Sequence, residues 1–147
     1  MSDQRPGRAL VVCKGNHCRS PLAALLIGVL SEGRIEAASA GLRDWHVGMP
    51  AHPLMVAAAT GLGYDLTGHE GAALTPALVE WADDLLAVDD ETAHALAERA
   101  PGRSVHVLGG GIADPFGQGR EAFVDAARRI EEAARAYVAG AGAATGR

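Results

Sequence analysis

The stretch of sequence that decides the fold reads Val11-Val12-Cys13-Lys14-Gly15-Asn16-His17-Cys18-Arg19-Ser20-Pro21. Residues 9–13 form a short apolar run rich in β-branched residues, which predicts a strand buried on both faces. Ser20 is a favourable N-cap residue and Pro21 suits the first helical position, so the sequence predicts that a helix begins here. A tight loop therefore joins the strand to a helix N-terminus, with a thiol at one end (Cys13) and a guanidinium at the other (Arg19).

The rest of the chain alternates between strands and helices. Further strands are expected at about 34–40, 85–88 and 104–108, and further helices at about 53–60, 76–81, 91–100 and 123–138. This alternation predicts a single α/β domain over residues 1–147, a three-layer sandwich in which helices cover both faces of a four-stranded parallel sheet. Residues 1–8 and the Gly/Ala-rich residues 139–147 are expected to be flexible ends.

Residues that could bind a ligand or take part in catalysis follow several of the expected strands. Cys13, Gly41 and Asp89 each come at the end of one, and a glycine-rich loop at 109–114 follows the last. Ligands of parallel sheets bind beyond the carboxyl ends of the strands. We therefore expect these residues to meet at one edge of the sheet.

Composition narrows the class of protein. The chain has 147 residues, of which 48% are hydrophobic and 21% charged, as in soluble globular domains. No apolar run approaches the roughly 18 residues of a membrane span, and no signal peptide is recognisable, so we expect a cytoplasmic protein without membrane insertion. A net charge of -5 without a Lys/Arg cluster in the sequence argues against a nucleic-acid partner. Two cysteines are too few for a disulfide scaffold.

The loop after the first strand suits an oxyanion. A helix N-terminus and a neighbouring guanidinium stabilise a thiolate, the nucleophilic form of Cys13, and the Ser20 hydroxyl could donate to it. Gly15 and Asn16 tolerate positive φ, which a loop with inward-pointing N–H groups requires. Such N–H groups bind a tetrahedral anion, and Arg19 could grip two of its oxygens. A lone cysteine at a strand end is usually a small buried hydrophobe, but this combination favours phosphate chemistry.

A carboxyl group for proton transfer is expected from Asp114. Taken alone, Asp114-Pro115 is typical of a turn. Together with the Cys13 loop, a carboxylic acid at the same sheet edge could protonate a departing phenol and later deprotonate water. We therefore predict that Cys13 and Asp114 act as a pair.

These motifs resemble the low-molecular-weight protein tyrosine phosphatase family in its bacterial form. The resemblance covers about Leu10 to Val138 and rests on the pattern Val-Cys-x-Gly-Asn-x-Cys-Arg-Ser-Pro-x-Ala from Val12, on Ser39-Ala40-Gly41, Asp44-Trp45-His46-Val47-Gly48, His69, Leu74-Thr75-Pro76, Val88-Asp89 and Asp114-Pro115-Phe116-Gly117. It implies a phosphatase without metal or cofactor that hydrolyses aryl phosphates. Its substrate would be phosphotyrosine in proteins or a small aryl phosphate, and its product inorganic phosphate.

The resemblance also implies roles for individual residues. Cys13 would attack phosphorus and form a phosphocysteine, Arg19 would hold the equatorial oxygens, and Asp114 would act as general acid and then base. The residues expected to bind the substrate are Lys14, Gly15, Asn16, His17, Cys18, Ser20, Trp45 and Phe116, the last two as aromatic walls of the cleft. Ser39 and His69 would join Asn16 and Ser20 in a network that supports the loop.

Several positions depart from the family pattern. Ala24 stands where the family often has Glu, Ala72 where many members carry Arg, and Gly117 where a second aromatic residue is frequent. His17 replaces the aliphatic residue of tyrosine-specific members and the threonine of bacterial arginine phosphatases, so it could alter substrate choice or be a solvated loop residue. The remaining histidines, His46, His52, His94 and His106, have no metal-ligand spacing and are expected on the surface or in loops.

Four alternatives remain beside the phosphotyrosine phosphatase. A protein arginine phosphatase on the same scaffold would explain an unusual His17. An arsenate reductase typically has Gln at the position of Pro21, and the thioredoxin-linked type needs cysteines beyond Cys18, so only a form coupled to a small thiol is compatible. A non-catalytic phosphate-binding module would not need Cys13, Arg19 and Asp114 together. A nucleotide-binding Rossmann domain is disfavoured because no G-x-G-x-x-G follows the first strand.

Overall fold

The computed structural model describes residues 7–145, with side chains to residue 141. In chain order the elements are β1 (Gly7–Cys13), α1 (Arg19–Leu30), β2 (Ile35–Gly41), α2 (Pro53–Gly61), α3 (Pro76–Trp81), β3 (Asp84–Ala87), α4 (Asp90–Arg99), β4 (Val105–Val107), a 3₁₀ turn (Leu108–Gly110) and α5 (Arg120–Thr145). The four strands are all parallel, in the order β2-β1-β3-β4. The predicted parallel sheet is therefore confirmed.

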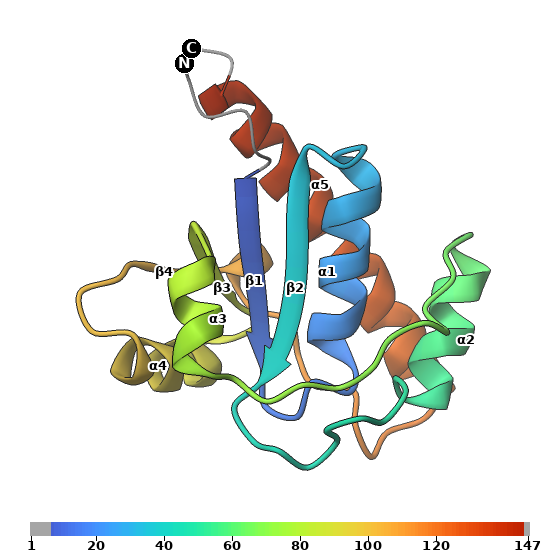
Figure 1. Ribbon diagram of the computed structural model, residues 1–147. Helices are drawn as coiled ribbons and strands as arrows, with labels where there is room; N and C mark the ends of the chain where they lie inside the picture. Colours follow the sequence, from blue (N-terminus) through green and yellow to red (C-terminus); the bar gives the residue numbers. More distant parts are fainter. Residues whose placement is uncertain (1–6, 146–147) are drawn as a thin grey trace.

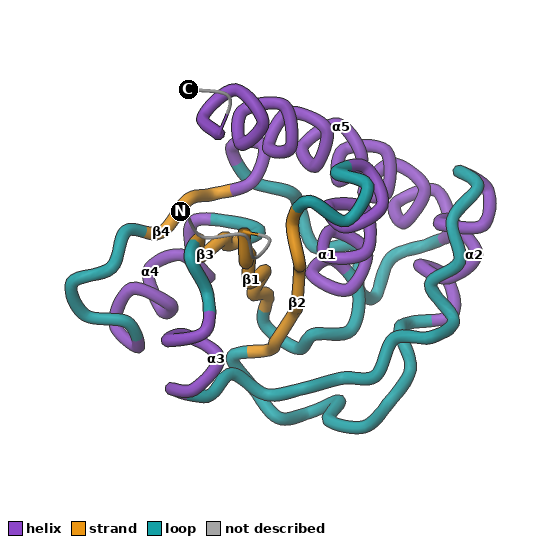
Figure 2. Tube along the Cα trace, turned by 45° about the horizontal axis from the view of Figure 1, so that its top comes forward, coloured by secondary structure: helices purple, strands orange, loops and turns teal. Residues whose placement is uncertain are grey.

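Helices cover both faces of the sheet, as Figures 1 and 2 show. On one face α1 and α5 pack together, and α2 lies against α5. On the other face α3 and α4 enclose a second, smaller core. None of the helices within residues 7–145 is both long enough and apolar enough to cross a membrane.

The central strand β1 supplies both cores. Val11 packs into the cluster formed with α1 and α5, whereas Leu10 and Val12 pack into the cluster under α3 and α4. All three side chains are fully buried. Because successive side chains of a strand point to opposite faces, a strand covered on both sides needs the unbroken apolar run that the sequence shows.

The start of α1 differs from the prediction. The helix begins at Arg19, and Cys18, not Ser20, occupies the N-cap position, without a side-chain capping bond. Ser20 lies inside the first turn, where its hydroxyl is 2.9 Å from the sulfur of Cys13. The expected capping role of Ser20 was therefore wrong, because this hydroxyl faces the preceding strand end instead of the helix backbone.

The ends of the described chain are more regular than expected. The helix α5 continues through the Gly/Ala-rich stretch to Thr145, since Val138 and Ala141 still pack against the core. At the other end, residues 7 and 8 already pair with β2. The remaining parts of the two predicted flexible ends, 1–6 and 146–147, lie outside the described residues.

The carboxyl ends of β1 and β2 lie at the lower end of Figure 1, where several loops converge. Gly41 makes this convergence possible, because a Cβ there would lie 2.9 Å from the carbonyl carbon of Gly15. The segment after α2 returns to the same place: the Gly41 N–H donates to the Ala72 carbonyl at 2.9 Å, and the Leu74 N–H donates to the Gly41 carbonyl at 2.8 Å. Residues from three parts of the chain thus surround the loop after β1.

Candidate active site

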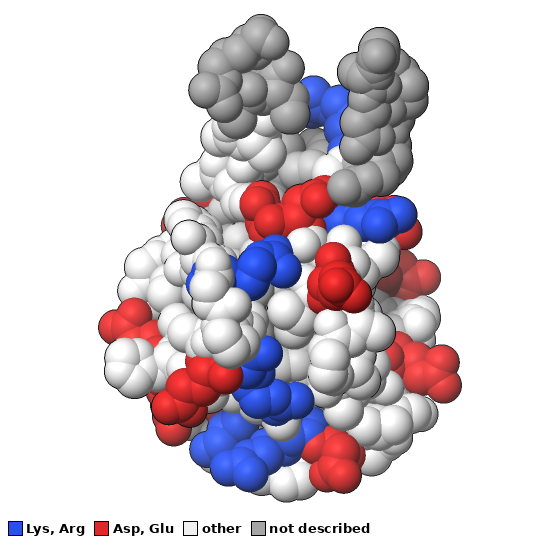
Figure 3. Space-filling view, turned by 60° about the vertical axis from the view of Figure 1, so that its left-hand side comes forward, with Lys and Arg blue, Asp and Glu red and all other residues white. Residues whose placement is uncertain are grey.

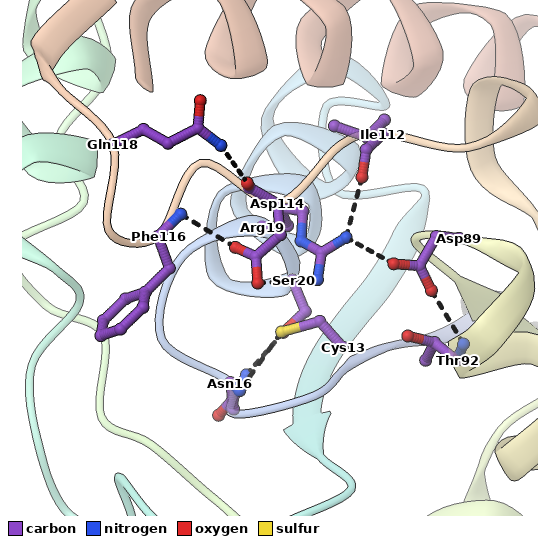
Figure 4. Close-up of polar contacts among 10 residues, drawn as sticks. All are labelled: Cys13, Asn16, Arg19, Ser20, Asp89, Thr92, Ile112, Asp114, Phe116 and Gln118. Carbon is purple, nitrogen blue, oxygen red and sulfur yellow. Dashed lines mark hydrogen bonds and ion pairs between the residues drawn. The ribbon is translucent and has the colours of Figure 1, made fainter. Parts of the chain in front are cut away.

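Cys13 ends β1 beneath the loop 14–18, with its side chain almost completely buried (Figure 4). Its sulfur accepts a hydrogen bond from the Asn16 N–H at 3.2 Å and lies 2.9 Å from the Ser20 hydroxyl. Both contacts can place a hydrogen on the sulfur, as a nucleophile in this loop requires. The sulfur also lines a pocket whose wall includes Arg19 and Asp114.

The loop around this sulfur presents donors with no partner. Within residues 7–145, the backbone N–H groups of Gly15, His17 and Cys18 make no hydrogen bond. These groups belong to a loop that leads into the N-terminus of α1, where further N–H groups are unused. Clustered N–H groups at a helix N-terminus form an anion-binding site.

Arg19 is only 3% exposed, and its guanidinium is held from two sides. Its Nη1 donates to the Asp89 carboxylate at 2.8 Å and to the Ile112 carbonyl at 2.8 Å, while Nη2 lies 3.6 Å from the Asp114 carboxylate. Partial burial raises the pKa of Asp89, but hydrogen bonds from Thr92 and Arg19 outweigh it and hold that pKa below its ordinary value. The guanidinium is therefore fixed in the pocket wall by a carboxylate that stays ionised.

Asp89 is the functional residue whose role the sequence did not reveal. Its position at a strand end was recognised, but its carboxylate also caps α4 by accepting from the Thr92 N–H at 2.8 Å. An N-cap signal before a helix was the available clue, and it pointed only to local structure. The contact with Arg19 spans 70 positions in the chain, and it exists because β1 and β3 are neighbours in the sheet.

Asn16 is the centre of a buried hydrogen-bond network. It has a positive φ of 55° and is 1% exposed. Its Nδ2 donates to the hydroxyls of Ser20 and Ser39, each at 2.9 Å, and its Oδ1 accepts from the Ala72 N–H at 2.8 Å. Nε2 of His69 donates to the Asn16 backbone carbonyl at 3.0 Å. The structure thus brings together the four residues expected to support the loop, and it adds the backbone of Ala72.

Two further details of this network concern the proton on His69 and the departure from the family pattern at Ala72. Burial lowers the pKa of His69, which opposes the smaller raising effects of Asn16 and Glu70. The ring is then neutral, and its Nε2 must carry the proton because a carbonyl only accepts. Ala72 contributes through its backbone N–H, so the loss of an arginine side chain at this position leaves the contact intact.

The two residues expected to need positive φ behave differently. Asn16 adopts the left-handed conformation, whereas Gly15 does not. At Gly15 space matters instead, since a Cβ there would lie 3.1 Å from Nδ1 of His46 and the imidazole would have to shift slightly. The expectation for Gly15 was therefore wrong in its reason: the neighbouring imidazole, not the backbone conformation, favours glycine.

Asp114 lies opposite the Cys13 loop on an exposed segment between β4 and α5. Its side chain is 47% exposed. One carboxylate oxygen accepts from the Phe116 N–H at 3.1 Å, and the Asp114 carbonyl accepts from the Gln118 side chain at 3.1 Å. The segment is tied to the sheet where the Ile112 N–H donates to the Val88 carbonyl at 2.7 Å. This arrangement places a carboxyl group at the mouth of the pocket, beside Arg19 (Figure 4).

Aromatic side chains form the outer walls of the pocket. Trp45 and Phe116 both line it and are 57% and 58% exposed. Lys14 Nζ lies 5.9 Å from the centroid of the Trp45 ring, and the guanidinium of Arg43 lies at the same distance. The structure therefore places Lys14, Trp45 and Phe116 around the pocket, and these are three of the residues that were expected to bind the substrate.

His17 belongs to a second wall, built of histidines. Its ring stacks on that of His46 with 3.8 Å between centroids and 2° between planes, and it lies 5.2 Å from His52 and 6.4 Å from Phe116. Burial lowers the pKa of His17 to about 4, helped by the neighbouring His46 and His52. His17 therefore presents a neutral, partly buried ring, not a solvated side chain. The sequence placed His46 and His52 in loops but gave no sign that their rings meet.

Cys18 shares the pocket but differs from Cys13 in its chemistry. It is 5% exposed, and burial together with the nearby Asp114 and Cys13 raises its pKa to about 12. Cys18 is thus a thiol at physiological pH, and the group that it offers to an anion is its backbone N–H. Within residues 7–145, no group of three or more His, Cys, Asp or Glu side chains is arranged to hold a metal ion.

A buried thiol under a cradle of free N–H groups, beside an anchored arginine and a carboxyl group, is the arrangement of a cysteine-dependent phosphatase. Residues 8–144 match the family described as low molecular weight phosphotyrosine protein phosphatase. The chain belongs to this family.

Individual relatives agree with this assignment. A probable low molecular weight protein-tyrosine-phosphatase, EpsP of Ralstonia nicotianae, is 34% identical over 135 residues, which cover 88% of this chain and 92% of the relative. A protein-arginine-phosphatase of Geobacillus stearothermophilus is 31% identical, covering 86% and 90%. Among solved structures, Wzb of Vibrio vulnificus in complex with benzylphosphonate has a TM-score of 0.85 at 31% identity, covering 91% of this chain and 98% of that one.

Proposed function

We propose that this protein hydrolyses phosphotyrosine in proteins through a phosphocysteine on Cys13, without a metal or cofactor. The observation that carries the proposal is the position of the Cys13 sulfur, which has hydrogen-bond partners on one side and opens into the pocket with Arg19 and Asp114. Phosphorylated protein would be the substrate and inorganic phosphate a product.

In the first step, the Cys13 thiolate attacks phosphorus and the phosphorus–oxygen bond to the phenol breaks. The electron pair of that bond goes to the phenolic oxygen, and Asp114 in its acid form supplies the proton. The free N–H groups of the loop and the Nε and Nη2 groups of Arg19 receive the equatorial oxygens. These donors are already in place, so they stabilise the charge of the transition state without reorganisation.

In the second step, water attacks the phosphocysteine and Asp114, now a carboxylate, accepts a proton from it. The sulfur–phosphorus bond breaks, and its electron pair returns to Cys13. The Asn16 N–H and the Ser20 hydroxyl stabilise the departing thiolate. Inorganic phosphate is then released, and the proton on Asp114 makes it an acid for the next cycle.

Aromatic walls support an aryl phosphate as the substrate. The phenyl ring of phosphotyrosine would pass between Trp45 and Phe116, where ring–ring contacts are favourable. The relative from Vibrio vulnificus holds benzylphosphonate, which combines a phenyl ring with a tetrahedral anion. Both cysteines are free thiols, which suits a cytoplasmic location.

Phosphoarginine is a second candidate substrate. His17 is neither aliphatic nor threonine, and one relative is named a protein-arginine-phosphatase. The neutral ring of His17 could accept a hydrogen bond from a guanidinium N–H, a donor that a phenol ester lacks. The ratio of kcat/KM for phosphotyrosyl and phosphoarginyl peptides of equal sequence distinguishes the two substrates.

The central test is Cys13→Ser. Replacing the nucleophile should reduce turnover of p-nitrophenyl phosphate and a phosphotyrosyl peptide by about 10⁴-fold or more. Arg128→Gln, which removes an exposed arginine on α5, serves as a control and should behave like the native protein. Substantial turnover by Cys13→Ser with either substrate would refute the proposed mechanism.

A further inference from the structure

Three cations from distant parts of the sequence meet around the segment that follows β2, and one of them, Lys14, lines the pocket. Lys14 lines the pocket, and its Nζ shares the Trp45 ring with the guanidinium of Arg43. The backbones of these two residues are joined, since the Arg43 N–H donates to the Lys14 carbonyl at 2.9 Å. From the end of α4, Arg99 reaches the residue before Arg43 by donating to the Leu42 carbonyl at 3.4 Å. We call Lys14, Arg43 and Arg99 the basic rim.

The described part of the chain offers no ion-pair partner to the charges of the basic rim. All three side chains are exposed, and no carboxylate within residues 7–145 lies within 4.0 Å of their nitrogen atoms. Figure 3 shows Lys and Arg gathered at the lower end of the molecule, with acidic side chains to either side. The acidic residues nearest in sequence are Asp44, directly after Arg43, and Glu98, directly before Arg99. An exposed cationic group on a chain of net charge -5 is a local feature, not the consequence of a basic protein.

The backbone and the Trp45 ring hold these charges in place. Cation–π contact orients Lys14 and Arg43 over Trp45. A second hydrogen bond, from Arg99 to the Leu74 carbonyl at 3.1 Å, fixes the third guanidinium. A partner that binds here therefore meets positions that are already arranged, which lowers the entropic cost of binding.

We propose that the basic rim binds acidic side chains that flank the phosphotyrosine of a protein substrate. The inference rests on the proposed function and extends it from the phosphorylated residue to its sequence neighbours. Because Lys14 directly follows Cys13 and lines the pocket, an acidic group that Lys14 holds would lie next to the phosphoryl group. An extended peptide advances about 3.3 Å per residue, so residues within a few positions of the phosphotyrosine would face the rim. This proximity favours a substrate segment over a separate partner.

The test compares two phosphotyrosyl peptides of equal length, with Glu or with Gln at the three positions on each side of the phosphotyrosine. Exposed ion pairs each change affinity by about 1.4- to 5-fold. We expect the native protein to prefer the Glu peptide by about 3- to 30-fold in kcat/KM at low salt. The preference should shrink towards one at 0.5 M NaCl, where charges are screened over a few ångströms.

Variants of the rim separate charge from structure. The double variant Arg43→Gln/Arg99→Gln should reduce the preference to about two-fold or less, whereas Arg43→Lys/Arg99→Lys should retain most of it. Arg128→Gln removes one positive charge from α5, outside the basic rim, and should leave the ratio unchanged. The same ratio in the Gln double variant as in the native protein, or a native ratio of one, would overturn the proposal.

Binding to Cys13→Ser keeps this test independent of turnover. The two peptides can be titrated into this variant by calorimetry, and the Glu peptide should again bind more tightly. If neither peptide nor p-nitrophenyl phosphate is hydrolysed by the native protein, the proposed function fails. If both peptides are hydrolysed and bound equally well, only the role of the basic rim fails.

Discussion

The two loops that meet at the pocket are held in opposite ways. In the loop 14–18, Asn16 is buried and its side chain makes three hydrogen bonds, to Ser20, Ser39 and Ala72. On the other side, Asp114 is 47% exposed, and its closest ion-pair distance is 3.6 Å, to Arg19. The proposed anion site is therefore built into the core, whereas the carboxyl group proposed for proton transfer belongs to the surface.

This difference suits the two tasks. Transition-state stabilisation requires donors that do not move, and buried networks provide them. A general acid has to meet the oxygen of a leaving group that enters from solvent, so it must lie at the mouth. We therefore expect substitutions in the two loops to separate stability from proton transfer.

Among substitutions that compare the two loops, the largest effect is expected from Asp114→Asn, which removes the proposed acid and leaves the loop 14–18 intact. Turnover should fall by about 10²- to 10³-fold, because general acid catalysis contributes on this scale. The loss should be greater for phenyl phosphate than for p-nitrophenyl phosphate, whose leaving group needs a proton less. Steady-state kinetics with both substrates measures it. An equal loss with both would remove Asp114 from the role of acid.

A smaller effect, now on stability, is expected from Asn16→Ala. The change leaves the Ala72 N–H without its acceptor and puts alanine at a positive φ of 55°. The free energy of unfolding should fall by about 1–3 kcal/mol, as measured by urea denaturation. Asp114→Asn provides the matched comparison and should change that free energy by less than about 0.5 kcal/mol. If the two variants have the same free energy of unfolding, the loop around Asn16 is not more important for stability than the segment around Asp114.

The smallest effect concerns the histidine wall, where His17 of one loop lies 6.4 Å from Phe116 of the other. Burial, with His46 and His52 adding to it, lowers the pKa of His17 to about 4, so between about pH 4 and 6.5 the unfolded chain binds the proton that the folded chain rejects. The titration of His17 should therefore leave the free energy of unfolding unchanged above pH 6.5 and lower it as the pH falls towards 4. Burial also lowers the pKa values of His52 and His69, so they act in the same direction.

Urea denaturation at pH 7 and pH 5 tests this contribution. The native protein should be less stable at pH 5, and His17→Asn should lose less stability between the two values. Because His17 is only partly buried, solvent screening makes the difference modest. An identical pH dependence in the two proteins would show that His17 does not contribute.

Much of the fold followed from local signals. The apolar run of β1 indicated a strand covered on both sides, and the alternation of strands and helices gave the parallel sheet. Predictions failed where a tertiary contact replaced a local preference. Ser20 faces Cys13 instead of capping α1, and α5 continues past residue 138 because Val138 and Ala141 still find the core.

The sequence by itself determined the anion loop, because Cys13 and Arg19 lie within one tight connection whose shape depends on nearby residues. It also indicated Asp114, although the roles of these residues remain predictions. Only the tertiary structure decided which carboxylate fixes Arg19 and which cations form the basic rim. The sequence contains no Lys/Arg cluster, yet Lys14, Arg43 and Arg99 become neighbours. Parallel strands direct their carboxyl ends to one edge, and that edge collects residues from distant parts of the chain.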